Sequence, residues 1–136
     1  MSVVLHSSIT LEWIYADKAT AALAQAMEMV VAGGAWVPAH WRFEVASVLE
    51  HNVSKGRHDF PFRDETLKDL NLLAIRVDPE THGRAWETTL QIAVRRSISF
   101  YDAAYLELAQ RRGLPLAVVD TTMRRMARHE DVAVVG

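Results

Sequence analysis

The sequence contains no cysteine, which excludes disulfide bonds, thiolate zinc sites and cysteine nucleophiles. Long apolar runs are also missing, and none approaches the roughly 20 residues that a membrane-spanning helix needs. The N-terminus lacks the basic start and the long apolar stretch of a signal peptide. We therefore expect a soluble cytoplasmic protein with no membrane partner.

An excess of positive charge is absent as well, since the 136 residues carry a formal net charge of −2. This balance gives no sign of a polycationic nucleic-acid binder. Basic residues outnumber acidic ones only from Arg95 onward, so the last third of the chain is its basic part.

Three motifs of common enzyme classes do not occur. The phosphate loops GxxxxGK[ST] and GxGxxG are both absent, which removes most support for the corresponding nucleotide-binding folds. The pattern GxSxG is absent too, and this argues against the nucleophile elbow of an α/β-hydrolase.

Short valine-rich runs alternate with longer segments of helical periodicity along the whole chain. The runs are typical of buried strands and cover residues 3–5, 35–37, 72–77, 115–119 and 132–135. One helical segment begins at Ser7, and others cover residues 16–34, 40–56, 61–73, 79–96 and 99–113. The alternation predicts βαβ units and a single α/β domain over residues 1–136. We expect three α/β/α layers, with a central parallel sheet flanked by helices.

A histidine follows the first of these runs. In the stretch VVLHSSITLEW, the strand-forming residues 3–5 lead into His6, and Ser7 and Ser8 then begin a helix. We therefore expect the side chain of His6 at the carboxyl end of a strand, which is the edge where open α/β sheets bind ligands.

Three acidic residues lie where predicted strands and helices meet. Asp120 directly follows a strand-like run, Asp102 falls in the first turn of the helix before that run, and Glu44 lies in the helix after the second run. A parallel topology can bring all three to one sheet edge together with His6. Converging carboxylates repel one another unless a cation such as Mg²⁺ or Mn²⁺ is present, and such ions activate water for attack on a phosphodiester.

Each acidic residue also has a simpler interpretation. Asp102 fits the acidic half of a capping box that begins at Ser99, and Asp120 fits the cap of the helix that follows it. Glu44 is harder to dismiss, because a buried carboxylate needs a partner, although Arg42 is near enough in sequence to pair with it.

Taken together, the segments VVLHSSITLEW, PAHWRFEVASVLE and SFYDAAYLELAQRRGLPLAVVD, with their spacing, resemble a PIN domain. Within that family the chain is similar to the VapC-type toxins of bacterial type II toxin–antitoxin pairs. The resemblance runs from Val3 to Val135. Its most distinctive part is YDAAYLELA followed by a strand that ends in aspartate.

The resemblance implies a metal-dependent endoribonuclease that cleaves RNA phosphodiesters with Mg²⁺ or Mn²⁺ as cofactor. It also implies a homodimer and inhibition by a cognate antitoxin protein. Carried over residue by residue, the catalytic and metal-binding carboxylates of the family fall on Glu44, Asp102 and Asp120. A supporting polar residue falls on Ser8, and His6 is a further candidate metal ligand.

His6 departs from the family pattern, in which an aspartate ends the first strand. An imidazole removes one negative charge from the cation site and suits Mn²⁺ or Zn²⁺ better than Mg²⁺. Three interpretations stay open. His6 marks a catalytically impaired copy that binds antitoxin or RNA, or it is a working ligand for a nitrogen-tolerant metal. The third is a structural histidine, or a laboratory substitution that disarms a toxic enzyme.

Basic residues flank two of the candidate acids. Arg95 and Arg96 precede the helix of one, and Arg124 and Arg125 follow the other. These arginines are candidates for contact with an RNA backbone, since phosphate contacts supply most nucleic-acid affinity. The alternative is an ordinary structural role, because basic residues are common at helix ends.

Overall fold

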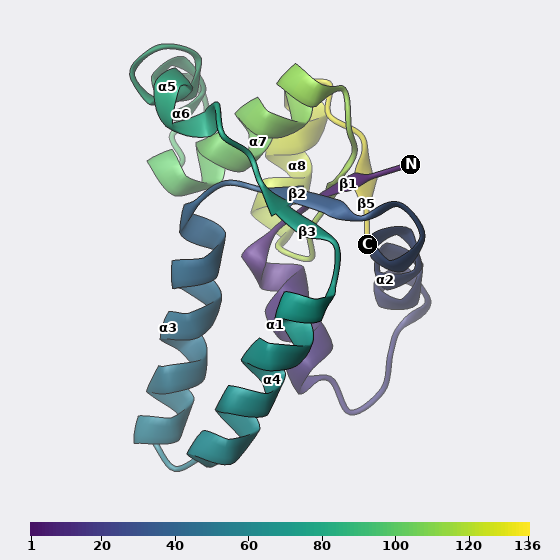
Figure 1. Ribbon diagram of the computed structural model, residues 1–136. Coiled ribbons are helices and arrows are strands. Elements are labelled where there is room, and N and C mark those ends of the chain that lie inside the picture. The colour runs from purple at the N-terminus through teal and green to yellow at the C-terminus, as the bar shows by residue number, and fades with distance from the viewer.

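The centre of the protein is a five-stranded parallel sheet, seen in a computed structural model that describes residues 1–136 (Figure 1). Its strands are β1 (Val3–Leu5), β2 (Ala35–Val37), β3 (Ile75–Val77), β4 (Leu116–Ala117) and β5 (Val134–Val135). Their order across the sheet is β3-β2-β1-β4-β5, and every neighbouring pair is parallel. The predicted parallel sheet is therefore confirmed.

Eight α-helices and one π-helical turn connect and cover these strands. They are α1 (Ser7–Tyr15), α2 (Ala21–Gly33), α3 (His40–Ser54), α4 (Phe60–Leu72), α5 (Thr81–Arg84), the π turn η1 (Ala85–Thr89), α6 (Leu90–Arg96), α7 (Phe100–Arg112) and α8 (Thr121–His129). None of these helices has the length and apolar character that crossing a bilayer requires.

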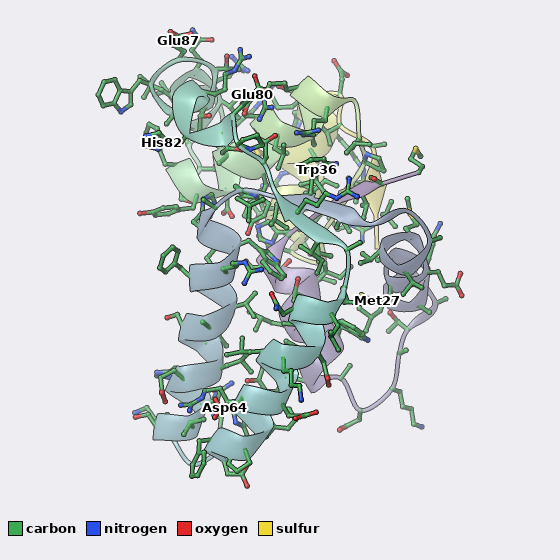
Figure 2. The ribbon with its side chains drawn as sticks, in the orientation of Figure 1. Met27, Trp36, Asp64, Glu80, His82 and Glu87 are labelled. Atoms are coloured by element: carbon green, nitrogen blue, oxygen red, sulfur yellow. The ribbon has the colours of Figure 1, made fainter.

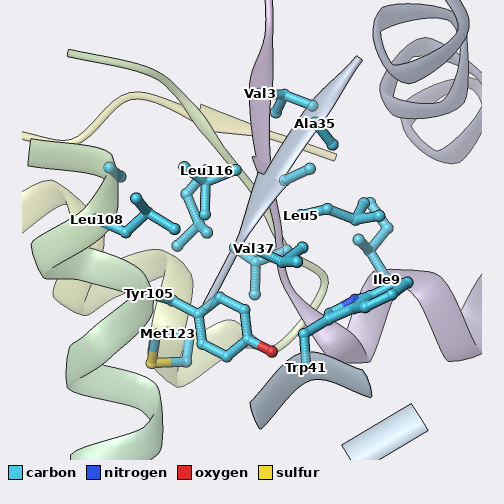
Figure 3. Close-up of a cluster of buried hydrophobic side chains, with 14 of the residues drawn as sticks. Val3, Leu5, Ile9, Ala35, Val37, Trp41, Tyr105, Leu108, Leu116 and Met123 are labelled. Atoms are coloured by element: carbon cyan, nitrogen blue, oxygen red, sulfur yellow. The ribbon is translucent and has the colours of Figure 1, made fainter. Parts of the chain in front are cut away.

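The helices form a layer on each face of the sheet, as right-handed crossovers require. Figure 1 shows α1 to α4 below the sheet and α5 to α8 above it. The inner strands β1, β2 and β4 are covered from both sides, which explains why their runs are continuously apolar rather than alternating. Figure 3 shows this for Val37, which lies among Ile9 of α1, Trp41 of α3 and Tyr105 of α7. The edge strand β3 leaves Arg76 and Val77 exposed. The predicted three-layer arrangement is confirmed.

The strand order reverses between β1 and β4. The chain proceeds from β1 to β2 and β3 in one direction, and then returns to β4 and β5 on the other side. Ligands of open α/β sheets bind outside the carboxyl ends of the strands at such a point. The backbone N–H of His6 donates to the carbonyl oxygen of Ala117 (3.0 Å), so the end of β1 lies directly beside the end of β4.

Residues 79–96 differ from the single amphipathic helix that the sequence predicts. They form the one-turn helix α5, the π turn η1 and the short helix α6 in succession. Gly83, Thr88 and Thr89 have low helix propensity. Departure from regular α-helical geometry therefore costs less free energy here than in an alanine-rich segment. Single π turns inside helices are frequent at functional sites.

Candidate functional site at the carboxyl edge of the sheet

His6 forms the N-terminal cap of α1 and has both ring nitrogens engaged. The backbone N–H of Ser8 donates to Nδ1 (3.0 Å), and the Ser8 hydroxyl oxygen lies 2.8 Å from the same nitrogen. Because Nδ1 accepts, the ring proton is assigned to Nε2. Nε2 lies 3.0 Å from Oδ1 of Asp102 and donates to it. The ring is buried, so these contacts fix its orientation.

Asp102 lies in the first turn of α7, where its backbone and its carboxylate have different partners. The backbone N–H donates to Oγ of Ser99 (3.1 Å), which confirms Ser99 as the helix cap. In a capping box the carboxylate would also turn back toward Ser99. Here it faces His6 instead, so the Asp102 side chain belongs to the sheet edge rather than to the cap.

Glu44 reaches the same edge from α3. Its Oε1 accepts a hydrogen bond from the Tyr105 hydroxyl (2.6 Å). Figure 3 shows the Tyr105 side chain, whose hydroxyl is directed from α7 toward α3. Burial and the neighbouring Glu44 carboxylate raise the pKa of Tyr105 far above its ordinary value, so the phenol remains a donor. Arg42, the partner that sequence proximity suggests, bonds to Asn71 instead (3.0 Å).

His40 is a member of this group that the sequence analysis missed. Its Nε2 donates to the carbonyl oxygen of Tyr101 (3.1 Å) and lies 3.8 Å from Oε1 of Glu44. Burial lowers the pKa of His40 and outweighs the opposite effect of Glu44. The rings of His6 and His40 both pack on Tyr105, at centroid distances of 4.4 and 5.2 Å. The sequence signal that points to His40 is its position one helical turn before Glu44.

Asp120 follows β4 at the same edge, but its carboxylate has a local role. It is exposed, and Oδ1 accepts the backbone N–H of Thr122 (3.3 Å), so Asp120 caps α8. Ser8 links the segment after β1 to the segment after β4, because its hydroxyl oxygen contacts His6 and also accepts a hydrogen bond from the backbone N–H of Val119 (3.4 Å). The structure thus brings His6, Ser8 and Asp102 together and leaves Asp120 at the rim.

Comparison with known proteins now identifies the architecture. The family described as PIN domain matches residues 3–129. The chain belongs to the PIN domain family. Among solved structures, the crystal structure of PAE2754 from Pyrobaculum aerophilum is similar, with a TM-score of 0.67 and 21% sequence identity over 93% of this chain and 87% of that chain. No curated protein matches the sequence.

PIN domains are generally metal-dependent nucleases, but a divalent ion does not fit the side chains of this PIN domain as they are arranged. No three histidine, aspartate or glutamate side chains gather closely enough to hold a metal ion. Asp102 and Glu44 have protein donors of their own, in His6 and Tyr105. Because one oxygen of each carboxylate bonds to a protein donor and no third ligand lies close by, we derive no catalytic step that passes through a metal.

The four arginines that the sequence analysis singled out differ in their contacts. Arg95 and Arg96 form ion pairs with Glu130, at 2.7 and 2.5 Å, and thereby hold α6 against the end of α8. Arg124 donates to the carbonyl oxygen of Gly136. Arg125 is exposed on α8. The ion pairs favour a structural role for the first two arginines, whereas Arg125 stays a candidate for RNA contact.

Replacing Glu130 by glutamine is expected to lower the free energy of unfolding at pH 7 by about 2 kcal/mol, because it leaves Arg95 and Arg96 without their buried counter-charge. The hydrogen bonds from Arg95, Arg96 and Gln110 outweigh burial and lower the pKa of Glu130 to about 2. This lies below the ordinary value of about 4.3, so the stabilisation is present above roughly pH 5 and is lost as the pH falls toward 2.

Thermal unfolding of both proteins between pH 7 and pH 3 measures this effect. The difference in melting temperature between the unmodified chain and Glu130→Gln should be largest at pH 7 and should shrink as the pH falls. A difference that stays constant over this range would contradict the assigned role of Glu130.

Proposed function

We propose that this PIN domain acts as an RNA-binding module of a VapC-type toxin–antitoxin pair, in which metal-dependent cleavage is lost or strongly reduced. The observation that carries the proposal is the engagement of His6. Its Nδ1 caps α1 and its Nε2–H donates to Asp102, so neither nitrogen is open for a metal. Hydrogen bonds from the His6 imidazole and the Tyr105 phenol stabilise the carboxylates of Asp102 and Glu44, so these carboxylates do not require a cation between them.

The surface supports partners of two kinds. Arg125 and Arg128 are exposed on α8, directly after Asp120, and give the site a basic margin suited to an RNA backbone. Trp86 and Val94 are large side chains that stand in solvent, 89% and 71% exposed, and exposed aromatic side chains are enriched at protein interfaces. These side chains support a cognate antitoxin protein and a second copy of the chain as further partners.

The competing candidate is the metal-dependent endoribonuclease itself, with Glu44, Asp102 and Asp120 as its acidic residues. One observation favours it. The side chains of Glu44 and Asp102 are each 32% exposed at the point where the strand order reverses, so a substrate can reach them.

One assay separates the two candidates. The unmodified chain and His6→Asp are incubated with end-labelled single-stranded and structured RNAs in Mg²⁺, in Mn²⁺ and in a chelator, and binding to the same RNAs is measured in the chelator. We expect cleavage only by His6→Asp with a divalent ion, and RNA binding by both proteins. The double variant His6→Asp with Glu44→Gln is the control and should bind without cutting.

Two results would count against the proposal. Cleavage by the unmodified chain in Mn²⁺ would make His6 a working ligand and the protein a nuclease with an altered metal preference. Absence of RNA binding by the unmodified chain would rule out the proposed RNA-binding function.

A further inference from the structure

A pocket of about 310 Å³ lies immediately beside the His6–Asp102 site. The start of α3, the segment α5–η1 and the start of α7 form its walls. His40 and Tyr101 belong to both places, since they line the pocket while His40 approaches Glu44 and Tyr101 precedes Asp102. Its volume falls in the range of small-molecule sites.

Three aromatic side chains line this pocket and are exposed to solvent. Phe43 is 77% exposed, Tyr101 is 62% exposed, and Phe100 also faces water. Tyr101 is held edge-on against His40, at a centroid distance of 5.1 Å. Exposed aromatic rings beside a concave surface offer faces on which a flat ring can stack.

A buried hydroxyl in the wall of the pocket has no partner. Thr89, at the end of η1, is only 1% exposed, and its Oγ1 is the one buried side-chain polar atom of the chain without a hydrogen bond. Threonine in a regular α-helix can bond the carbonyl four residues earlier, but no such bond forms here. An unpaired buried hydroxyl is unfavourable, and this oxygen is out of reach of solvent. It therefore marks a weak point in the packing of the pocket wall and is not a contact for a ligand.

The charge of the lining limits what the ligand can be. The ten lining residues include no aspartate, glutamate, lysine or arginine, so the pocket is built neither for a cation nor for a phosphate. Two imidazoles, those of His40 and His82, supply polar groups. Figure 2 shows His82 on α5, toward the beginning of α3, while the nearest acidic side chain of the π turn, Glu87, is directed outward. An uncharged flat ring with a hydrogen-bonding edge matches this lining.

We propose that this pocket binds one unstacked nucleobase of an RNA strand, which stacks on Phe43 and Tyr101 while its edge faces the imidazole of His82. The inference rests on the proposed RNA-binding function and names the part of the RNA that is recognised. Single-stranded RNA is commonly bound in this way, by bases that leave the stack and lie on aromatic side chains.

The test uses fluorescence anisotropy with a fluorescein-labelled single-stranded RNA in a chelator, and the same RNA with one abasic nucleotide at each position in turn. For the unmodified chain, one abasic position should weaken binding about tenfold. Phe43→Ala and Tyr101→Ala should weaken binding of the intact RNA by a similar factor and remove the effect of the abasic site. Phe60→Ala is the matched control, because Phe60 is also exposed, at 61%, but lies on α4 away from the pocket.

His82→Phe gives a second readout that a purely structural role would not produce. The substitution keeps an aromatic ring in the pocket and removes the ring nitrogens, so RNA binding should weaken while the melting temperature changes little. Normal RNA binding by the pocket variants would overturn the inference and leave the proposed function intact. Loss of self-association in those variants, with RNA binding unchanged, would assign the pocket to a second copy. No RNA binding by the unmodified chain would remove both proposals.

Discussion

Replacing Asp78 by alanine should lower the free energy of unfolding by about 3–5 kcal/mol, because it removes a buried carboxylate that pairs with two arginines. Arg112 then has no acidic partner, while Arg111 keeps only Glu107 as a buried one. The Asp78 side chain is 0% exposed and lies just after β3. Its Oδ2 accepts from Arg111 (2.7 Å) and from the hydroxyl of Thr81 (2.7 Å), and its Oδ1 accepts from Arg112 (2.9 Å). One carboxylate therefore joins β3, α5 and the end of α7.

The same contacts determine the protonation state of the Asp78 carboxylate. Burial alone would raise the pKa of Asp78, but the hydrogen bonds from Arg111, Thr81 and Arg112 outweigh it and hold the pKa well below its ordinary value. The carboxylate stays ionised throughout the neutral range. Arg112 also stacks on Trp36, at 3.5 Å from the ring centroid, so losing Asp78 loosens a further contact with β2.

Urea denaturation followed by far-UV circular dichroism measures the effect of Asp78→Ala. Asp64→Ala is the control, because Asp64 forms an ion pair with Arg63 at the surface, and exposed pairs contribute only about 0–1 kcal/mol. If Asp78→Ala were as stable as Asp64→Ala, the cluster around Asp78 would not hold the fold together.

His6→Asp should make the stability of the protein depend on divalent ions. The substitution replaces a donor to Asp102 with a shorter carboxylate, so it removes one charge-assisted hydrogen bond and adds repulsion between two like charges at the sheet edge. Aspartate is a good N-cap, and the cap of α1 is therefore preserved. We expect a loss of about 2–3 kcal/mol without divalent ions and recovery in Mg²⁺ or Mn²⁺.

Differential scanning fluorimetry with and without Mn²⁺ checks this expectation. The unmodified chain should melt at the same temperature in both conditions. His6→Asn is the matched control, because asparagine caps a helix and adds no charge, so its stability should not respond to metal. A rise in the melting temperature of the unmodified chain with Mn²⁺, equal to that of His6→Asp, would show that His6 accommodates the ion.

The secondary structure and the sheet were accessible from the sequence because they depend on near neighbours. Continuous valine-rich runs indicate strands covered on both faces, and the parallel sheet follows from their alternation with helices. Ser99 sits directly before the helix that it caps, so its role needs no knowledge of the rest of the chain. The break at η1 was missed, since helical periodicity is nearly the same on either side of a π turn.

The candidate site was accessible only in part. The sequence alone placed His6, Asp102 and Asp120 near the carboxyl edge of the sheet, because residues that follow parallel strands or begin the intervening helices meet there. It could not decide which of them touch. The His6–Asp102 hydrogen bond joins residues that are 96 positions apart in the sequence. Asp120 follows the neighbouring strand β4 at the same edge, but its carboxylate caps α8 and does not contact His6.

By itself, then, the sequence determined the layers, the strands, the helix cap at Ser99 and the edge at which chemistry could occur. These follow from backbone hydrogen bonding and apolar periodicity, which act over a few residues. Only the tertiary structure decided that His6 donates to Asp102, that His40 joins Glu44, and that Asp78 anchors two arginines. A hydrogen bond requires two atoms within about 3 Å, and that separation depends on the packing of every element between them.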